Sequence, residues 1–119
     1  MLSDTEFGRL WVDIKEAVAE NTERRKTIDD IVRDALKRLA SIIKVAPHGT
    51  RCICILAWDN DPEAHAALMD EAAEQIESFL SSKKLPVFVE EDGTEALFEG
   101  DDDKPSDNYL LVDVSALLS

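Results

Sequence analysis

The segment from Asp59 to Glu63 (Asp-Asn-Asp-Pro-Glu) contains the side chains best suited to chemistry in this sequence. It follows an apolar stretch that predicts a strand, and carboxylates at the carboxyl end of a strand often hold magnesium or a ligand in open α/β sheets. The segment begins like a calcium loop, but Pro62 and Ala64 stand where an EF-hand needs a spacer and a glycine. Magnesium-dependent phosphoryl transfer would also need more carboxylates and a phosphate-binding lysine or glycine-rich loop. We therefore predict a turn and a helix cap here, with a metal site as the alternative.

Zinc is the second chemistry to consider, because Cys52, Cys54, His48 and His65 could supply four ligands. Their spacing matches no structural zinc pattern. Cysteines at i and i+2 of a strand lie about 7 Å apart, which is poor disulfide geometry, so we predict reduced thiols. Neither histidine has a serine or cysteine at a spacing typical of a nucleophile and base pair. We predict no catalytic residue, no metal and no cofactor, and hence no enzyme.

Charge is distributed very unevenly along the 119 residues, whose net charge is −13. Residues 1–58 hold nine acidic and ten basic side chains, and residues 59–119 hold seventeen and three. Nine carboxylates and a single cation, Lys104, lie between residues 90 and 107. Such a field repels nucleic acids and anionic membranes and attracts basic proteins. The predicted partner-binding residues are these carboxylates: Glu90, Glu91, Asp92, Glu95, Glu99, Asp101, Asp102, Asp103 and Asp107.

Other partners and compartments are less favoured by the composition. Arg24-Arg25-Lys26 is the one basic cluster, and we interpret it as solvated surface rather than a site for direct nucleic-acid binding. No apolar run approaches the ~18 residues of a membrane span. The first residues resemble no secretion signal, so we expect a cytoplasmic protein.

The first half of the chain predicts two helices. Ser3 and Glu6 form a capping box, and an apolar face follows, made by Phe7, Leu10, Trp11, Ile14 and Val18. This helix should end near Asn21, before a polar turn over residues 22–26. Thr27 then caps a second helix, which Pro47-His48-Gly49 stops. The two helices should form an antiparallel hairpin.

The second half predicts strands around a third helix. Residues 51–58 are nearly continuously apolar and predict a central strand. Asp61 should cap a helix that ends near Ser82 and buries Leu68, Ala72, Ile76, Phe79 and Leu80. Residues 86–90 and 95–99 flank Asp92-Gly93, a strong hairpin signal, which places Glu90 opposite Glu95. Residues 100–108 should form a loop and residues 109–116 the last strand.

A single α+β domain spanning residues 1–119 is therefore predicted. Its order is a helical hairpin followed by β-α-β-β-β, with a four-stranded mixed sheet and helices covering at least one face. The connection between the first two strands should be right-handed. Trp11 and Trp58 are expected in the core, although the first helix could instead present Phe7 and Trp11 to a partner, with a homodimer through the helical hairpin as one possibility.

The overall profile, a short acidic domain without a catalytic signature, resembles the small proteins that phages encode against host defences, anti-CRISPR proteins in particular. The resemblance implies that the carboxylates occupy a nucleic-acid-binding groove on a basic protein, in the host cytoplasm if the protein is phage-encoded. Immunity proteins against basic nuclease toxins share the profile, and both imply inhibition by occlusion. The alternatives are a non-catalytic assembly or adaptor subunit and, third, a metal-dependent enzyme.

Overall fold

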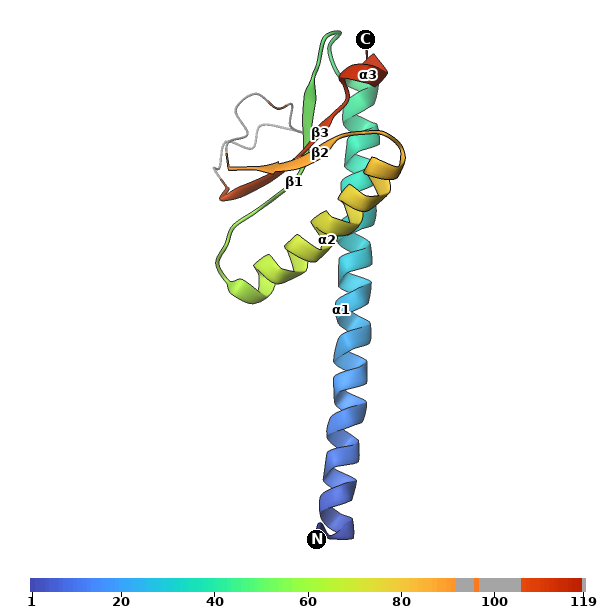
Figure 1. The fold of residues 1–119 in the computed structure, drawn as a ribbon, viewed down its shortest axis with the longest axis vertical. Coiled ribbons are helices and arrows are strands. Elements are labelled where there is room, and N and C mark those ends of the chain that lie inside the picture. The colour runs from blue at the N-terminus through green and yellow to red at the C-terminus, as the bar shows by residue number, and fades with distance from the viewer. Residues whose placement is uncertain (92–95, 97–105, 119) are drawn as a thin grey trace.

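The computed structural model describes residues 1–91, residue 96 and residues 106–118. Its elements are α1 (Asp4–Val45), β1 (Cys52–Trp58), α2 (Glu63–Ser82), β2 (Val87–Glu90), β3 (Asn108–Asp113) and α3 (Ser115–Leu118). The fold is α+β, and α1 extends far beyond the rest of the molecule (Figure 1). We call residues 4–22 the stalk and the part of the chain from residue 28 onwards the head.

The predicted helical hairpin is wrong, because residues 4–45 form one continuous helix of 42 residues. The polar segment 22–26 contains no glycine or proline, and Glu, Arg and Lys are good helix formers. Thr27 does not cap a new helix: its hydroxyl donates to the Glu23 carbonyl one turn earlier, and Thr22 donates to Val18 in the same way. Both threonines thus satisfy their hydroxyls inside the helix. The predicted start is confirmed, since the Ser3 side chain accepts a hydrogen bond from the Glu6 amide.

The predicted four-stranded mixed sheet is also wrong. In the described residues the sheet has three strands in the order β1-β3-β2, and both pairings are antiparallel. The central strand is therefore β3, whereas β1, predicted to be central, lies at an edge. Because α2 returns the chain across the sheet, β1 and β2 run in the same direction and β3 fills the place between them (Figure 1). The predicted hairpin partner of β2, residues 95–99, lies outside the described residues except for Ala96.

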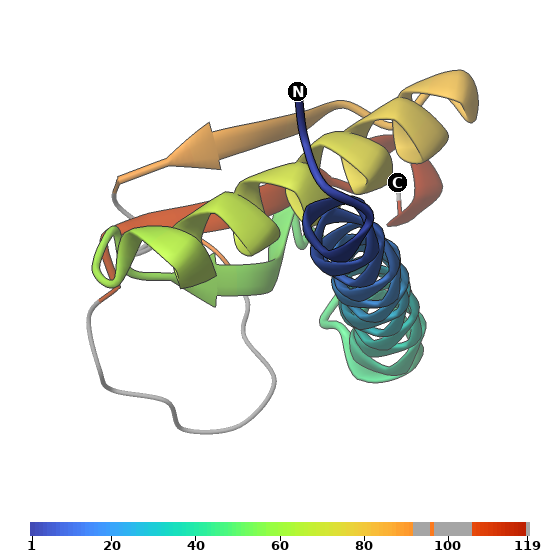
Figure 2. The same ribbon diagram turned by 90° about the horizontal axis from the view of Figure 1, so that it is seen from below.

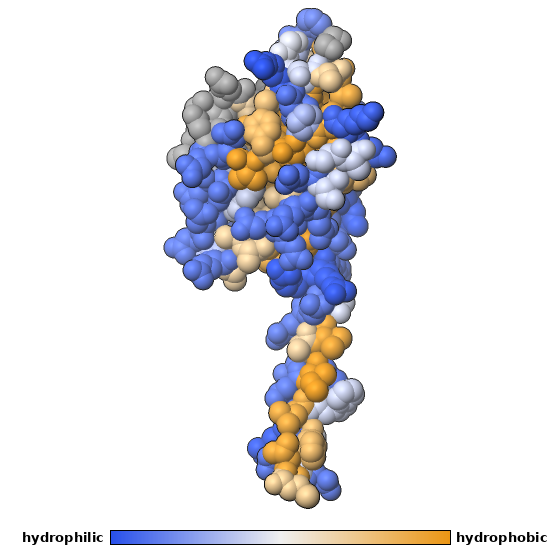
Figure 3. All heavy atoms as spheres, viewed as in Figure 1, coloured by the Kyte–Doolittle hydropathy of each residue, from blue (hydrophilic) through white to orange (hydrophobic). Residues whose placement is uncertain are grey.

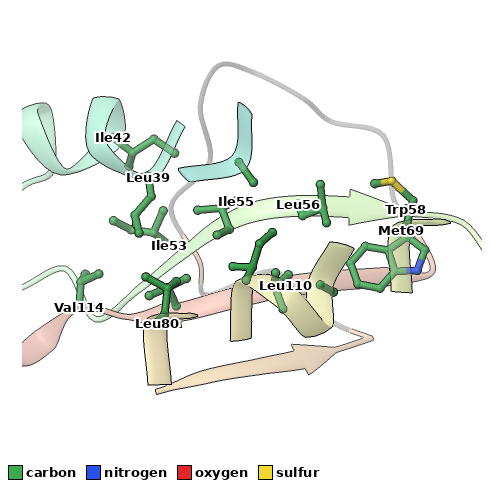
Figure 4. Packing of buried hydrophobic residues seen from close by; sticks show 14 residues of the cluster. Leu39, Ile42, Ile53, Ile55, Leu56, Trp58, Met69, Leu80, Leu110 and Val114 are labelled. Atoms are coloured by element: carbon green, nitrogen blue, oxygen red, sulfur yellow. The ribbon is translucent and has the colours of Figure 1, made fainter. Parts of the chain in front are cut away.

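The helices cover one face of this sheet, where the main core lies (Figures 2 and 4). Alternate residues of the strands point into it, and a register shift between Cys54 and Leu56 lets Ile55 and Leu56 both pack there. The core residues are Ala35, Leu39 and Ile42 of α1, Met69, Ala73, Ile76 and Leu80 of α2, and Ile53, Ile55, Leu56, Trp58, Leu110, Val112 and Val114 of β1, β3 and the residue after β3. A smaller cluster on the opposite face contains Cys54, Tyr109 and Leu111.

Helix α2, which was predicted as the third helix, ends where predicted but starts differently. It ends at Ser82 as predicted, but Pro62 takes the cap position without a side-chain hydrogen bond, so Asp61 is not the cap. Its buried face includes Ala72, Ile76 and Leu80, whereas Phe79 is exposed.

The molecule is elongated because the stalk projects from the head. Its principal extents are 69 × 29 × 20 Å and its radius of gyration is 19.1 Å, whereas a compact chain of this length would have a radius of about 13–14 Å. Every residue from 1 to 27 is exposed, and Ile28 is the first buried residue of α1. The stalk therefore contributes nothing to the core.

Candidate functional site

The acidic segment after β1 is engaged in a structural clamp rather than gathered around an empty site. The Asn60 amide donates to Asp107 Oδ2 (2.9 Å), and the Asp107 amide donates to Asp59 Oδ1 (3.2 Å). The Asn108 side-chain amide donates to Asn60 Oδ1 (2.8 Å) and to the Trp58 carbonyl (3.4 Å). These bonds tie the end of β1 to the start of β3. The segment thus forms a turn, as predicted, and no group of three or more metal ligands occurs in the described residues.

The four residues considered for zinc are not brought together into a ligand cluster within the described ranges. His48 lies in the turn after α1, His65 is exposed on α2, and Cys52 and Cys54 lie in β1 and form no disulfide. Burial raises the pKa of the Cys54 thiol to about 11, an effect that the hydrogen bond to the Leu56 carbonyl and nearby Arg38 only partly oppose. A neutral, buried thiol is typical of a core residue and unlike a reactive one.

The structure places only part of the predicted acidic partner-binding segment. Glu90 and Glu91 are exposed at and just beyond the end of β2, with Glu90 paired in register to Tyr109 of β3. Asp107 belongs to the clamp described above. The other six predicted carboxylates lie outside the described residues: Asp92, Glu95, Glu99, Asp101, Asp102 and Asp103.

The most conspicuous surface feature is an apolar stripe along the stalk, visible as the orange band on the lower helix in Figure 3. The stripe consists of five large side chains that are each about half exposed: Phe7 (57%), Leu10 (47%), Trp11 (56%), Ile14 (53%) and Val18 (61%). The prediction that Trp11 belongs to the core is therefore wrong, whereas Trp58 is buried and its indole N–H donates to Asp70. Both tryptophans lie among apolar residues in the sequence, but only Trp58 packs against the sheet and a helix.

The stripe follows the spacing of a coiled-coil seam. Phe7, Trp11, Ile14 and Val18 are separated by four, three and four residues, the alternation of a and d positions in a heptad. The same alternation continues through Asn21 and Arg25 into the head, where it reaches Ile28, Val32, Ala35, Leu39 and Ile42. The head covers this second part of the seam. The first part has the same pattern and is left uncovered.

Charged side chains flank the stripe unevenly. Between Asp4 and Glu20 the stalk carries five acidic and two basic residues, whereas residues 23–26 carry one acidic and three basic residues. The Lys15 ammonium lies 5.5 Å from the Trp11 ring centroid, one turn along the helix. Arg24 forms an ion pair with Glu71 of α2 where the helix enters the head. The stalk is thus acidic, and the segment that joins it to the head is basic.

A shallow groove of about 510 Å³ lies where α1 meets the start of α2, lined by Glu23 and Arg24 of α1 and by Ala64 and Leu68 of α2 among others. Ligand sites usually combine an apolar pocket with a few converging polar groups. Here Arg24 is already paired with Glu71, so the groove offers no converging set. We do not assign a small-molecule site to it.

Comparisons of the chain with protein-family models, with curated proteins and with solved structures find no match. In the part of the chain that the structure describes, no helix is both long enough and apolar enough to cross a membrane. The exposed surface of the molecule is therefore the source of any functional inference.

The sequence prediction placed the stalk stripe in the core and gave its presentation to a partner as the alternative, which the exposure of these residues favours. The missed signal is the heptad spacing, which keeps its phase through the polar residues 21 and 25 and predicts one long helix. A 42-residue helix is about 63 Å long, more than a head of this size can cover.

Proposed function

We propose that this protein is a non-catalytic assembly or adaptor subunit that associates with a protein partner through the apolar stripe of its stalk. The single observation that carries the proposal is the exposure of Phe7, Leu10, Trp11, Ile14 and Val18 on a stalk that makes no contribution to the core.

The size of the stripe supports an interface. Five large apolar side chains at half exposure offer roughly 500 Å² of apolar surface, as much as the largest patch on a typical monomer. A standard interface buries about 800 Å² of surface on each partner. In homodimers about 65% of the buried surface is apolar. The apolar area of the stripe is therefore close to the apolar area that one partner buries in a complete interface.

The energetics of the helix support the same function. Isolated helices are marginal in water, and most helical stability in proteins comes from packing an apolar face. The stalk also contains Gly8 and β-branched residues, which lower helix propensity. A partner that covers the stripe would supply the packing that the head does not provide.

Site-specific photocrosslinking in cells tests this proposal. A photoreactive amino acid replaces Ile14 (53% exposed), and the matched control replaces Val12 (51% exposed), which lies on the opposite side of the same helix. We expect crosslinked protein at position 14 and much less at position 12. Equal yields at both positions, or no crosslink at position 14, would contradict the proposal.

A second candidate function is inhibition of a basic, nucleic-acid-handling protein by occlusion, through the acidic segment between residues 90 and 107. The excess of acidic residues in the second half of the chain favours it, and so does the exposure of Glu90 and Glu91 at the edge strand β2. This candidate uses the head, whereas the assembly function uses the stalk. One protein could carry both surfaces.

A further inference from the structure

We propose that the partner of the stalk is the stalk of a second copy of this chain, packed antiparallel. This inference rests on the proposed assembly function and specifies the partner. In the pairing, residues whose numbers add up to 25 lie opposite one another, so that each a position meets a d position of the second copy.

This register gives a complete apolar seam. Phe7 lies opposite the second copy's Val18, and Trp11 lies opposite its Ile14. Each opposed pair forms one layer of the seam, and the two-fold axis generates a second copy of each layer. Each layer thus combines a large aromatic side chain with a smaller β-branched one, which allows interdigitation without voids. Leu10 and Ala17 lie beside the seam on one side and widen it.

Polar residues close the seam at both ends. In the same register Asp4, the first residue of α1, lies opposite Asn21, the polar residue that follows Val18 in the heptad pattern. The paired segment therefore runs over residues 4–21, about 27 Å of helix. It stops before Ile28, where the head begins to cover α1, so the two heads lie at opposite ends of the dimer.

Charge selects the antiparallel orientation over the parallel one. An antiparallel pair places Asp4 of each stalk within about one helical turn of residues 24–26, the basic segment that joins the other stalk to its head. A parallel pair would place the two basic clusters side by side, with Arg25 opposite Arg25 in the seam. Like charges held close together at a pairing surface are unfavourable and are a common means of excluding a wrong orientation.

The first test is the molecular mass of the purified full-length chain by sedimentation at several concentrations. We expect the species to approach twice 13.3 kDa as the concentration rises. Ile14→Glu should weaken association by about 100-fold or more, because each dimer contains two layers with Ile14. Val12→Glu makes the same chemical change off the seam and should alter the dissociation constant by less than about 3-fold. Neither change touches the core, so the circular dichroism of the head should persist in both variants.

The second test measures the orientation with spin labels on single cysteines in a Cys52→Ser background. A label at Asp13 lies near the two-fold axis and should give a distance below about 20 Å, since paired helices lie 8–10 Å apart. A label at Glu23 should give a distance of about 30 Å or more, because its counterpart lies 21 residues further along the axis.

Each other outcome overturns the inference in a recognisable way. Short distances at both positions would indicate a parallel pair, and a species heavier than two chains would indicate a different assembly. A monomer of 13.3 kDa at every concentration would exclude a second copy as the partner. In that case crosslinks from position 14 to another protein in cells would still support the assembly function, whereas their absence would remove both.

Discussion

At the residue scale, Asp59 and Asp107 show how neighbours decide what a carboxylate does. Both residues come from the acidic second half of the chain, and each accepts a backbone amide from the other's loop. Glu91 comes from the same charged segment and is exposed at the end of β2. Residue type alone makes these three side chains equivalent candidates for binding, and their hydrogen bonds separate them into two roles.

Replacing Asp107 should therefore destabilise the head even though its side chain is exposed. Asp107→Ala removes the acceptor of the Asn60 amide and should lower the free energy of unfolding by about 1 kcal/mol. The control, Glu91→Ala, removes an exposed charge outside the clamp. It should change the free energy of unfolding by less than about 0.5 kcal/mol. Urea denaturation of both variants measures the difference. Equal effects would mean that the clamp contributes nothing to stability.

At the element scale, α1 is one helix whose two parts are covered differently. Ser3 caps its start, and the heptad spacing continues along its length. The helix-forming segment 22–26 joins its two parts without a break. The part from Ile28 onwards packs on the sheet and α2, whereas the stalk relies on contacts within its own helix. The stalk should accordingly respond to changes in helix propensity more than to changes in packing.

Two glycines provide a matched test of this difference. A Cβ atom added at Gly8 or at Gly49 would meet no atom within 4 Å, so neither site is crowded. Gly8 lies inside the stalk helix, where Gly8→Ala should stabilise the helix by about 1 kcal/mol and raise the amide protection of the stalk. Gly49 has φ +92°, so Gly49→Ala should instead lower the stability of the head by about 1 kcal/mol. Hydrogen exchange measures the expected stabilisation of the stalk in Gly8→Ala, and thermal unfolding measures the expected destabilisation of the head in Gly49→Ala.

At the scale of the whole molecule, the two proposed surfaces are separated in space. The apolar stripe lies on a stalk that extends the molecule to 69 Å, whereas the acidic excess belongs to residues 59–119, which build most of the head. In the proposed antiparallel dimer the two acidic heads would lie at opposite ends. This arrangement would let one assembly display two acidic surfaces to a basic partner.

Binding through the acidic segment should depend steeply on salt and on the position of the charges. Changing Glu90, Glu95, Asp101 and Asp102 to Lys should abolish capture of basic proteins from a lysate of the native cells, and rising salt should weaken capture by the wild type. The control changes Asp61, Glu63, Glu74 and Glu77 to Lys, which alters the net charge equally at another place. If both variants capture the same proteins as the wild type, the acidic-surface function is wrong. Loss in both would attribute binding to net charge alone.

The sequence by itself determined the local features of this protein. Ser3 caps α1, residues 52–58 form a strand, α2 ends at Ser82, and the apolar stripe of α1 can be read from its spacing, since each depends on neighbouring residues only. The candidate site was thus visible as a helix face but was assigned to the core. Whether Phe7 and Trp11 are covered depends on where the rest of the chain packs, and the head is too small to reach them. The tertiary structure likewise decided that β3 lies between β1 and β2. Strand order results from competition among pairings of distant segments, and the local periodicity of the sequence contains no information about that competition.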